Sequence, residues 1–111
     1  MNQHHFVTAF NDLAGDIHFT AREKGWWDAE RNVGEVIALM HSELSEALEA
    51  ARMGNPPDDK VPEFGGIETE LADTIVRIMD AAHGFGWKVA EALVAKIEYN
   101  KTRARKHGGK A

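Results

Sequence analysis

The chain has 111 residues, no cysteine and a formal net charge of −5 at neutral pH. This length predicts one domain, residues 1–111, and the lack of cysteine excludes both a disulfide framework and a thiolate metal site. The acidic balance disfavours nucleic-acid binding. No apolar run approaches the roughly 20 residues that span a bilayer, and the N-terminus lacks the form of a secretory signal. We therefore expect a cytoplasmic protein that contacts neither nucleic acid nor membrane.

The first predicted helix covers about residues 4–24 and is apolar on two sides. Helical spacing gives it a main stripe of Phe6, Phe10, Leu13, Ile17 and Ala21, and a weaker stripe of Val7, Ala14 and His18. Two apolar sides are expected inside a helix bundle or at a subunit interface. A histidine on such a stripe is more often a packed, hydrogen-bonded core residue than a ligand. Gly25 is expected to end the helix.

Two adjacent tryptophans, Trp26 and Trp27, follow the first helix. Either both rings fill the end of the bundle, or one of them stacks on a planar ligand such as a nucleobase. The second predicted helix covers about residues 33–53, and Asp28 or Asn32 is expected to cap its N-terminus.

The second helix carries two carboxylates, Glu43 and Glu46, beside its main apolar face. Leu39 and Ala50 lie near them on the helix surface, so the pair has apolar neighbours and differs from an ordinary solvated charge run. A loop rich in glycine and proline follows at residues 54–66. It is long for a connection between helices, and long loops in small domains are often functional.

The third predicted helix covers about residues 67–83 and places Glu70, Asp73 and Arg77 along a common strip. Asp73 and Arg77 lie four residues apart and are candidates for an ion pair. An exposed pair of this kind would contribute well under about 1 kcal/mol to stability. The apolar surface of this helix extends to more than one side, so we expect it to be central.

The fourth predicted helix covers about residues 87–105 and places Lys96, Asn100 and Arg103 on one ridge. A solvated ridge is the simplest interpretation, but asparagine is a poor helix former, so Asn100 inside a helix suggests a hydrogen-bonding task. The basic residues Lys101, Arg103, Arg105, Lys106 and Lys110 gather near the C-terminus, and the tail from 107 to 111 is expected to be disordered. The basic cluster is either a solvated helix end favoured by the helix dipole or an attraction for an anion such as a triphosphate.

Four helices without a predicted strand indicate an all-α, four-helix-bundle-like protomer. A chain of this size often gains buried area by associating with copies of itself. Within it, E-L-S-E at residues 43–46 and E-L-A-D at residues 70–73 each place two carboxylates one helical turn apart. If the two helices pack antiparallel across the loop, four carboxylates converge, and such mutual repulsion is relieved by a hard cation.

An all-carboxylate ligand set favours Mg²⁺, or Mn²⁺, over Zn²⁺. The two pairs do not fit a di-iron bundle, which needs Glu-x-x-His on two helices. Four carboxylates on adjacent helices also exceed what glycosidase chemistry requires. The chain contains no P-loop, no Rossmann glycine pattern and no zinc motif.

Three motifs together resemble the MazG-like group of all-α nucleoside triphosphate pyrophosphohydrolases. That family has E-E-x-x-E, a spacer, E-x-x-D, and then a helix with a lysine and an asparagine near its end. The matching segments here are S-E-L-S-E at 42–46, E-L-A-D at 70–73 and K-I-E-Y-N-K at 96–101. The similarity covers roughly residues 9–105. Ser42 departs from the first glutamate of the pattern, which puts one outer contact of the site in doubt.

The resemblance implies a single Mg²⁺-dependent domain that converts a nucleoside triphosphate to the monophosphate and pyrophosphate, as housecleaning of the nucleotide pool. The implied catalytic metal ligands are Glu43, Glu46, Glu70 and Asp73. The implied phosphate or sugar contacts are Lys96 and Asn100, assisted by Arg77 or Arg103. His18 and Trp27 occupy positions that line the base pocket in related members. Members of the family form homodimers or homotetramers with sites between subunits.

Two other interpretations remain at this stage. The chain could be a non-catalytic helical module that binds nucleotides or a protein partner, with a structural cation site or only surface charge at the carboxylates. It could instead hydrolyse another diphosphate-containing metabolite, such as an alarmone or a nucleotide sugar. The sequence leaves open the preferred base and sugar, the number of metal ions, and the choice between two and four chains.

Overall fold

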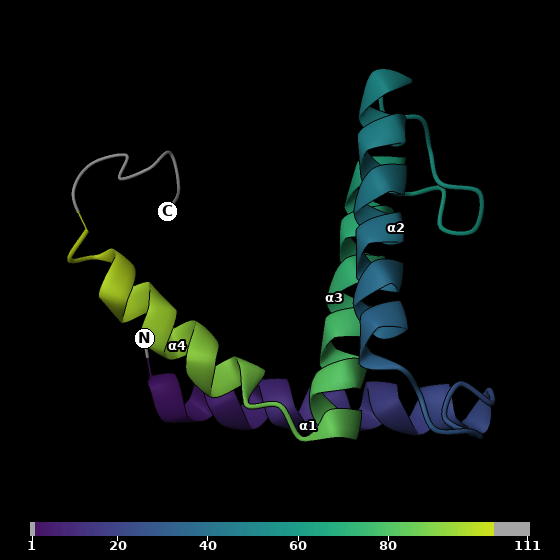
Figure 1. Cartoon of the computed structure of the whole chain (residues 1–111). Helices are drawn as coiled ribbons and strands as arrows, with labels where there is room; N and C mark the ends of the chain where they lie inside the picture. Colours follow the sequence, from purple (N-terminus) through teal and green to yellow (C-terminus); the bar gives the residue numbers. More distant parts are fainter. Residues whose placement is uncertain (1, 104–111) are drawn as a thin grey trace.

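The computed structural model describes residues 2–103, which form four α-helices and no strand (Figure 1). These are α1 (Gln3–Glu23), α2 (Val33–Arg52), α3 (Gly66–Phe85) and α4 (Val89–Asn100). The predicted all-α class is confirmed. The fourth helix is shorter than predicted, because the chain turns at residues 101–103, and the predicted disordered tail lies outside the described residues. No helix in the described part is long and apolar enough to cross a membrane.

Helix ends follow the local sequence signals. Asn32 caps α2, since its side chain accepts a hydrogen bond from the backbone N–H of Glu35, and this selects one of the two predicted caps. Gly25 follows α1 with φ of 90°, and Gly86 ends α3 with φ of 73°. Both are left-handed conformations that favour glycine, so each helix stops where the chain must change direction.

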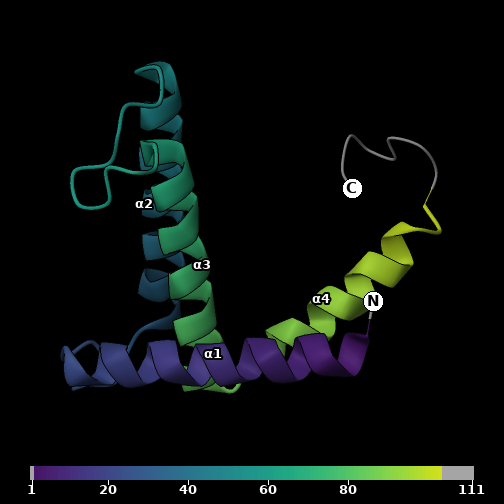
Figure 2. The same ribbon diagram turned by 180° about the vertical axis from the view of Figure 1, so that it is seen from behind.

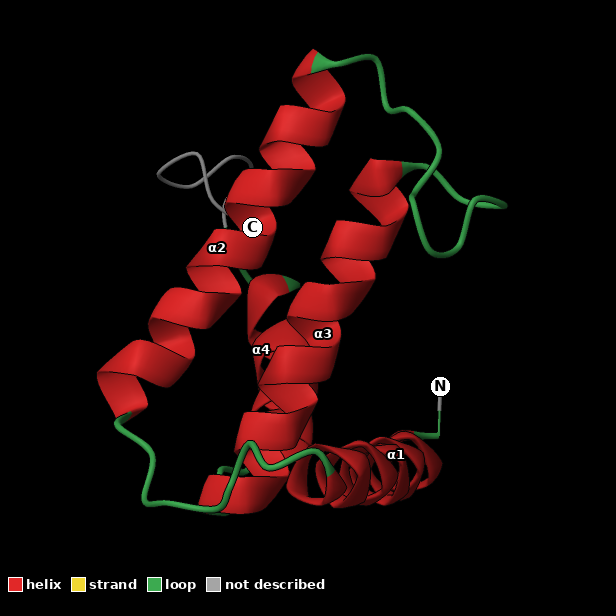
Figure 3. Ribbon diagram, turned by 90° about the vertical axis from the view of Figure 1, so that its right-hand side faces the viewer, coloured by secondary structure: helices red, strands yellow, loops and turns green. Residues whose placement is uncertain are grey.

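Helices α2 and α3 form an antiparallel hairpin, and α1 runs crosswise beneath it (Figures 1 and 3). The buried core is built largely from small side chains. Ala14 of α1, Ala81 and Ala82 of α3, and Ala90 of α4 are all at most 5% exposed. Small residues at these positions let the helix backbones approach closely, so the core is compact but limited in area.

The stripe of α1 that was predicted to be the weaker one holds the most buried residue of this helix. Leu13, on the predicted main stripe, is 53% exposed, whereas Ala14, on the weaker stripe, is 2% exposed. The reason is that α3 crosses α1 over the weaker stripe, as the His18–Asp80 hydrogen bond shows. The main stripe of α1 is therefore left partly uncovered in the single chain.

The four helices do not close into a bundle within one chain. Helix α4 packs against α1 and diverges from the α2–α3 hairpin (Figures 1 and 2). Apolar side chains stay exposed as a result: Leu44, Leu48, Leu71 and Ile75 on the hairpin, and Leu93 and Ile97 on α4. Instead of the predicted four-helix bundle, the chain forms an antiparallel α2–α3 hairpin that packs on α1, and α1 and α4 form a second, more open pair.

The loop between α2 and α3 is tied to the start of α3. The Asp58 carboxylate accepts bonds from the backbone N–H groups of Lys60 and Val61 and from the Thr69 hydroxyl. The backbone N–H of Val61, the Thr69 hydroxyl and the N–H of Lys60 lower the pKa of Asp58. The loop is therefore held in a fixed shape beside the hairpin.

Candidate functional site

Three of the four predicted carboxylates meet on one side of the hairpin. Glu43 and Glu46 of α2 and Glu70 of α3 each place one oxygen within 4.8 Å of the others. The i, i+3 spacing puts the first two on one face of α2, and the antiparallel turn of the chain brings α3 beside them. Asp73 is exposed and lies along the same cleft, but it is not part of this group.

Glu43 is the most buried of the three at 8% exposure, and it is paired. The Nε–H of Arg77 donates to Glu43 Oε1 at 2.9 Å. The predicted ion pair between Asp73 and Arg77 is therefore wrong. The guanidinium reaches across to α2 because a buried carboxylate gains more from a cation than an exposed one does.

Glu70 is in the opposite condition. Its Oε1 is buried and finds no hydrogen-bond donor among the described residues. Burial, and next the neighbouring carboxylates of Glu43 and Glu46, raise the pKa of Glu70 from its usual 4.5 to about 7. An added cation at this point would favour the charged form of Glu70 and remove the repulsion.

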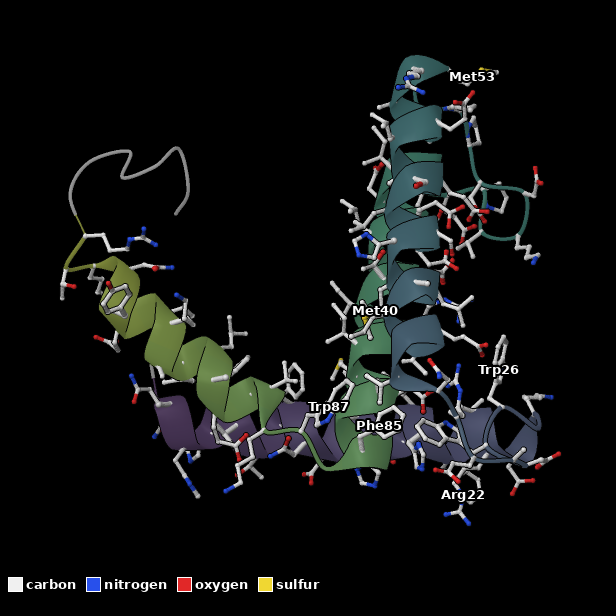
Figure 4. The ribbon with its side chains drawn as sticks, in the orientation of Figure 1. Arg22, Trp26, Met40, Met53, Phe85 and Trp87 are labelled. Carbon is white, nitrogen blue, oxygen red and sulfur yellow. The ribbon has the colours of Figure 1, made fainter. Side chains whose placement is uncertain are left out.

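The carboxylates line an open cleft with a volume of about 790 Å³. The 53–65 loop contributes Asp58 and Lys60 to its wall, and the connection between α1 and α2 contributes Trp26 and Arg31. In Figure 4, Trp26 lies on the same side of the hairpin as this loop. The cleft thus combines an acidic floor with cationic and aromatic side chains, a composition suited to a metal-bound organic phosphate.

Trp26 is held at the cleft by two guanidinium groups. Arg77 Cζ lies 5.3 Å and Arg31 Cζ 5.6 Å from the centre of its ring. The side chain is still 48% exposed. Cation–π contacts of this kind orient an aromatic face without burying it.

His18 and Trp27, the predicted base-pocket residues, lie behind this wall. Both bind Asp80: His18 Nδ1 is 2.8 Å from Oδ1, and the Trp27 indole N–H lies 3.0 and 3.1 Å from the two oxygens. Trp27 also packs edge-on against Phe85 and fills the space over Gly84. Of the two adjacent tryptophans, Trp26 is therefore the one that lines the cleft.

Sequence reasoning missed Asp80 and Arg31, both of which line the cleft. A signal for Asp80 was present, because positions 70, 73, 77 and 80 follow one strip of α3 at helical spacing. Arg31 lies in a connection between helices, where periodicity gives no information.

The predicted α4 residues are not brought to the cleft within one chain. Lys96 Nζ and Arg103 Cζ lie 5.1 and 5.8 Å from the ring centre of Tyr99, on the same helix end. Asn100 Oδ1 is buried and has no donor among the residues described. The basic residues 105, 106 and 110 fall outside the described part of the chain.

The donor set fits a hard divalent cation. All three converging side chains are carboxylates, and one of their oxygens, Glu70 Oε1, is buried without a hydrogen-bond partner among residues 2–103. Comparisons with protein-family models, with curated proteins and with solved structures find no match for this chain.

Proposed function

We propose that this protein is a Mg²⁺-dependent nucleoside triphosphate pyrophosphohydrolase, with Mn²⁺ as a possible substitute metal. The observation that carries the proposal is the buried oxygen of Glu70, which has no partner among the described residues and lies beside Glu43 and Glu46 in the lining of an open cleft. Three carboxylates this close are electrostatically unfavourable unless a cation joins them. The motif resemblance to the MazG-like group points the same way.

Glu43, Glu46 and Glu70 would hold the metal, and Asp73 lies along the same cleft as a further ligand. Bound Mg²⁺ supplies neutralisation of phosphate charge and acidifies a coordinated water. Glu46 is the exposed carboxylate of the three, and in our proposal it accepts the proton of the attacking water. Oxygen of that water bonds to the α-phosphorus, the bond from this phosphorus to the bridging oxygen breaks, and pyrophosphate leaves.

Cationic side chains on the cleft wall suit the polyphosphate. Lys24, Lys60, Arg31 and Arg77 all line the cleft. Their positive charges can attract the polyphosphate and bind its oxygens in the cleft. The half-exposed face of Trp26 offers a surface for the base.

We further propose that the site is completed by a second copy of the chain, in a homodimer or homotetramer with a bundle formed between protomers. The exposed apolar residues of the hairpin and of α4 support this, since a single chain leaves them in water. Lys96, Asn100 and Arg103 would then reach a partner's cleft rather than their own. Nucleotide-pool housecleaning in the cytoplasm is the role that we propose for the enzyme.

The test is pyrophosphate release from a panel of deoxynucleoside and ribonucleoside triphosphates, with Mg²⁺ and with EDTA. We expect Mg²⁺-dependent release from one or a few nucleotides. Glu43→Ala and Asp73→Ala should each lower turnover by about 10³-fold or more, because a bound metal supplies several kcal/mol of transition-state stabilisation. Both variants should keep the helical circular dichroism signal.

Glu49→Gln is the matched control, because Glu49 lies on the same helix with an exposed side chain. Full activity in both the Glu43 and Asp73 variants would defeat the assignment. No release from canonical or modified triphosphates would favour the non-catalytic binding module, and release from another diphosphate metabolite would change the substrate while keeping the chemistry.

A further inference from the structure

The Asp80 carboxylate joins three parts of the chain. It lies on α3, is 8% exposed, and accepts hydrogen bonds from His18 of α1 and from Trp27. Arg31 adds an ion pair, with its NH1 3.6 Å from Oδ2. Trp27 and Arg31 belong to the connection between α1 and α2, so one side chain holds two points of a segment that has no secondary structure of its own.

These contacts are the long-range polar anchor of that connection. The backbone hydrogen bonds of residues 24–32 run to partners at most five positions away, such as Trp26 N–H to the Ala21 carbonyl. Within the described residues, the hydrogen bonds and ion pair that join residues 24–32 to α3 all end on Asp80. Without them the segment would be restrained only by local turns and ring contacts.

The connection carries part of the cleft wall. Trp26 and Arg31 both line the cleft, and Arg77 of α3 contacts the Trp26 ring while donating to Glu43. A shift of the connection would therefore move an aromatic face and a guanidinium relative to the carboxylates. It would also remove a contact of the cation that pairs with Glu43.

We propose that Asp80 is a positioning residue that presets the Trp26 and Arg31 wall of the cleft for a planar, anionic ligand. The identity of that ligand as a nucleoside triphosphate rests on the proposed function. Asp80 acts through the connection: its two oxygens accept hydrogen bonds from His18 and Trp27 and form an ion pair with Arg31. Such presetting reduces the entropy lost when the ligand binds.

Hydrogen exchange tests the positioning. In Asp80→Ala exchange should accelerate at the amides of residues 24–32 by about 10-fold or more beyond the acceleration at the α2–α3 hairpin around Glu43, which follows the overall loss of stability alone. Trp27→Phe, which keeps the ring and loses the N–H donor, should loosen the same segment to a smaller degree. Asp80→Asn should be intermediate, since it keeps one acceptor oxygen. Asp12→Asn, an exposed carboxylate of α1, is the control and should change nothing.

Kinetics test the consequence for the ligand. In Asp80→Ala we expect KM, and the Kd of an α,β-imido deoxynucleoside triphosphate, to rise about 10-fold with kcat within about 3-fold, because binding rather than the chemical step depends on the wall. Mg²⁺ affinity measured in the absence of nucleotide should be unchanged. A merely structural role would instead lower kcat, weaken Mg²⁺ binding and accelerate exchange in the hairpin as much as in residues 24–32.

The outcomes separate this inference from the proposed function. A wild-type chain that binds the imido analogue but turns over no triphosphate contradicts the proposed function, and the inference then stands on exchange and affinity. A wild-type chain that is active, with unchanged exchange at 24–32 or unchanged KM and Kd in Asp80→Ala and Trp27→Phe, overturns the inference alone. Should Asp80→Ala fail to fold, Asp80→Asn and Trp27→Phe carry the same test.

Discussion

Asp80 and Glu70 lie on one strip of α3, but their carboxylates have opposite surroundings. Asp80 accepts hydrogen bonds from His18 and Trp27 and forms an ion pair with Arg31. Glu70 faces two other carboxylates and has a buried oxygen without a donor among the described residues. A buried acid that is fully hydrogen-bonded supports the fold, whereas one that is left unsatisfied persists only where something other than stability requires it. The difference separates a residue that anchors the fold from a residue that we propose as a metal ligand.

The largest effect should come from removing the anchor. Asp80→Ala leaves the Trp27 N–H and the Arg31 guanidinium without their acceptor in a mostly buried setting, and we expect the free energy of unfolding to fall by about 2–4 kcal/mol. Urea unfolding followed by circular dichroism measures it. A loss no greater than that of an exposed aspartate such as Asp12→Asn would remove the contrast between the two carboxylates.

A second prediction concerns the surface on which Trp27 rests. A side-chain carbon at Gly84 would meet the Trp27 indole directly, whereas one at Gly15 would come only to ordinary contact, 3.4 Å from His83. Both glycines lie inside helices, where alanine is intrinsically favoured by about 1 kcal/mol. Gly15→Ala should therefore be neutral or stabilising, and Gly84→Ala should cost about 1–3 kcal/mol by overpacking.

The same pair of variants reports on the anchor. Gly84→Ala should displace the indole from Asp80, so its Trp27 N–H resonance should shift in a nitrogen–proton spectrum, while Gly15→Ala leaves it in place. Equal stability of the two variants would mean that Trp27 is not held where its bond to Asp80 requires.

Replacing the Glu70 carboxylate should raise the free energy of unfolding, whereas replacing that of Asp80 lowers it. Because the pKa of Glu70 is raised from 4.5 to about 7, its neutral form is favoured in the fold. The stability from this group is present below its unfolded pKa and is lost as pH rises through the folded pKa. Without metal, the wild type should lose stability between about pH 5 and pH 8, and Glu70→Gln should be more stable at the upper pH by about 1–2 kcal/mol after allowance for solvent screening.

Added Mg²⁺ should make the wild type more stable than Glu70→Gln at the upper pH. It should stabilise the wild type at the upper pH and should leave Glu70→Gln nearly unchanged. Its binding should release protons near and below pH 7, where Glu70 is still partly protonated, and calorimetry in buffers of different ionisation enthalpy detects that release. A Glu70→Gln variant that is less stable than the wild type at every pH without metal would show that Glu70 is a structural residue.

The acidic cluster was predictable because it depends on short spacings. Helical periodicity fixes which face Glu43, Glu46 and Glu70 occupy, and a loop between two amphipathic helices dictates an antiparallel hairpin. The partner of Arg77 was not predictable in this way. Its choice of Glu43 over Asp73 depends on how deeply each carboxylate is buried, which only the packing of α2 against α3 decides.

The arrangement of α1 and α4 was harder to predict from the sequence, because it also depends on packing between distant residues. Apolar spacing identified both stripes of α1, but it does not tell which stripe packs within the chain and which one stays uncovered. The Asp80 anchor joins residues separated by 53 and 62 positions, so neither Trp27 nor His18 signals its partner locally. The four helices were therefore predictable, and their crosswise assembly was not.

The smallest effect is expected for Glu49→Gln, which serves as the reference for Glu70→Gln. Glu49 lies on α2, three residues beyond Glu46, and within residues 2–103 it pairs only with Arg52, at 3.7 Å, with both side chains more than 60% exposed. Glu49→Gln removes the same charge as Glu70→Gln, yet it should change the free energy of unfolding by at most about 0.5 kcal/mol, because water screens the pair. It should also leave the Mg²⁺-induced shift in Tm intact. If Glu49→Gln weakened that shift as much as Glu70→Gln does, Mg²⁺ would be stabilising the protein by screening its net charge of −5 rather than by binding at a site. A shift that depends on Glu70 and not on Glu49 is what three converging carboxylates require.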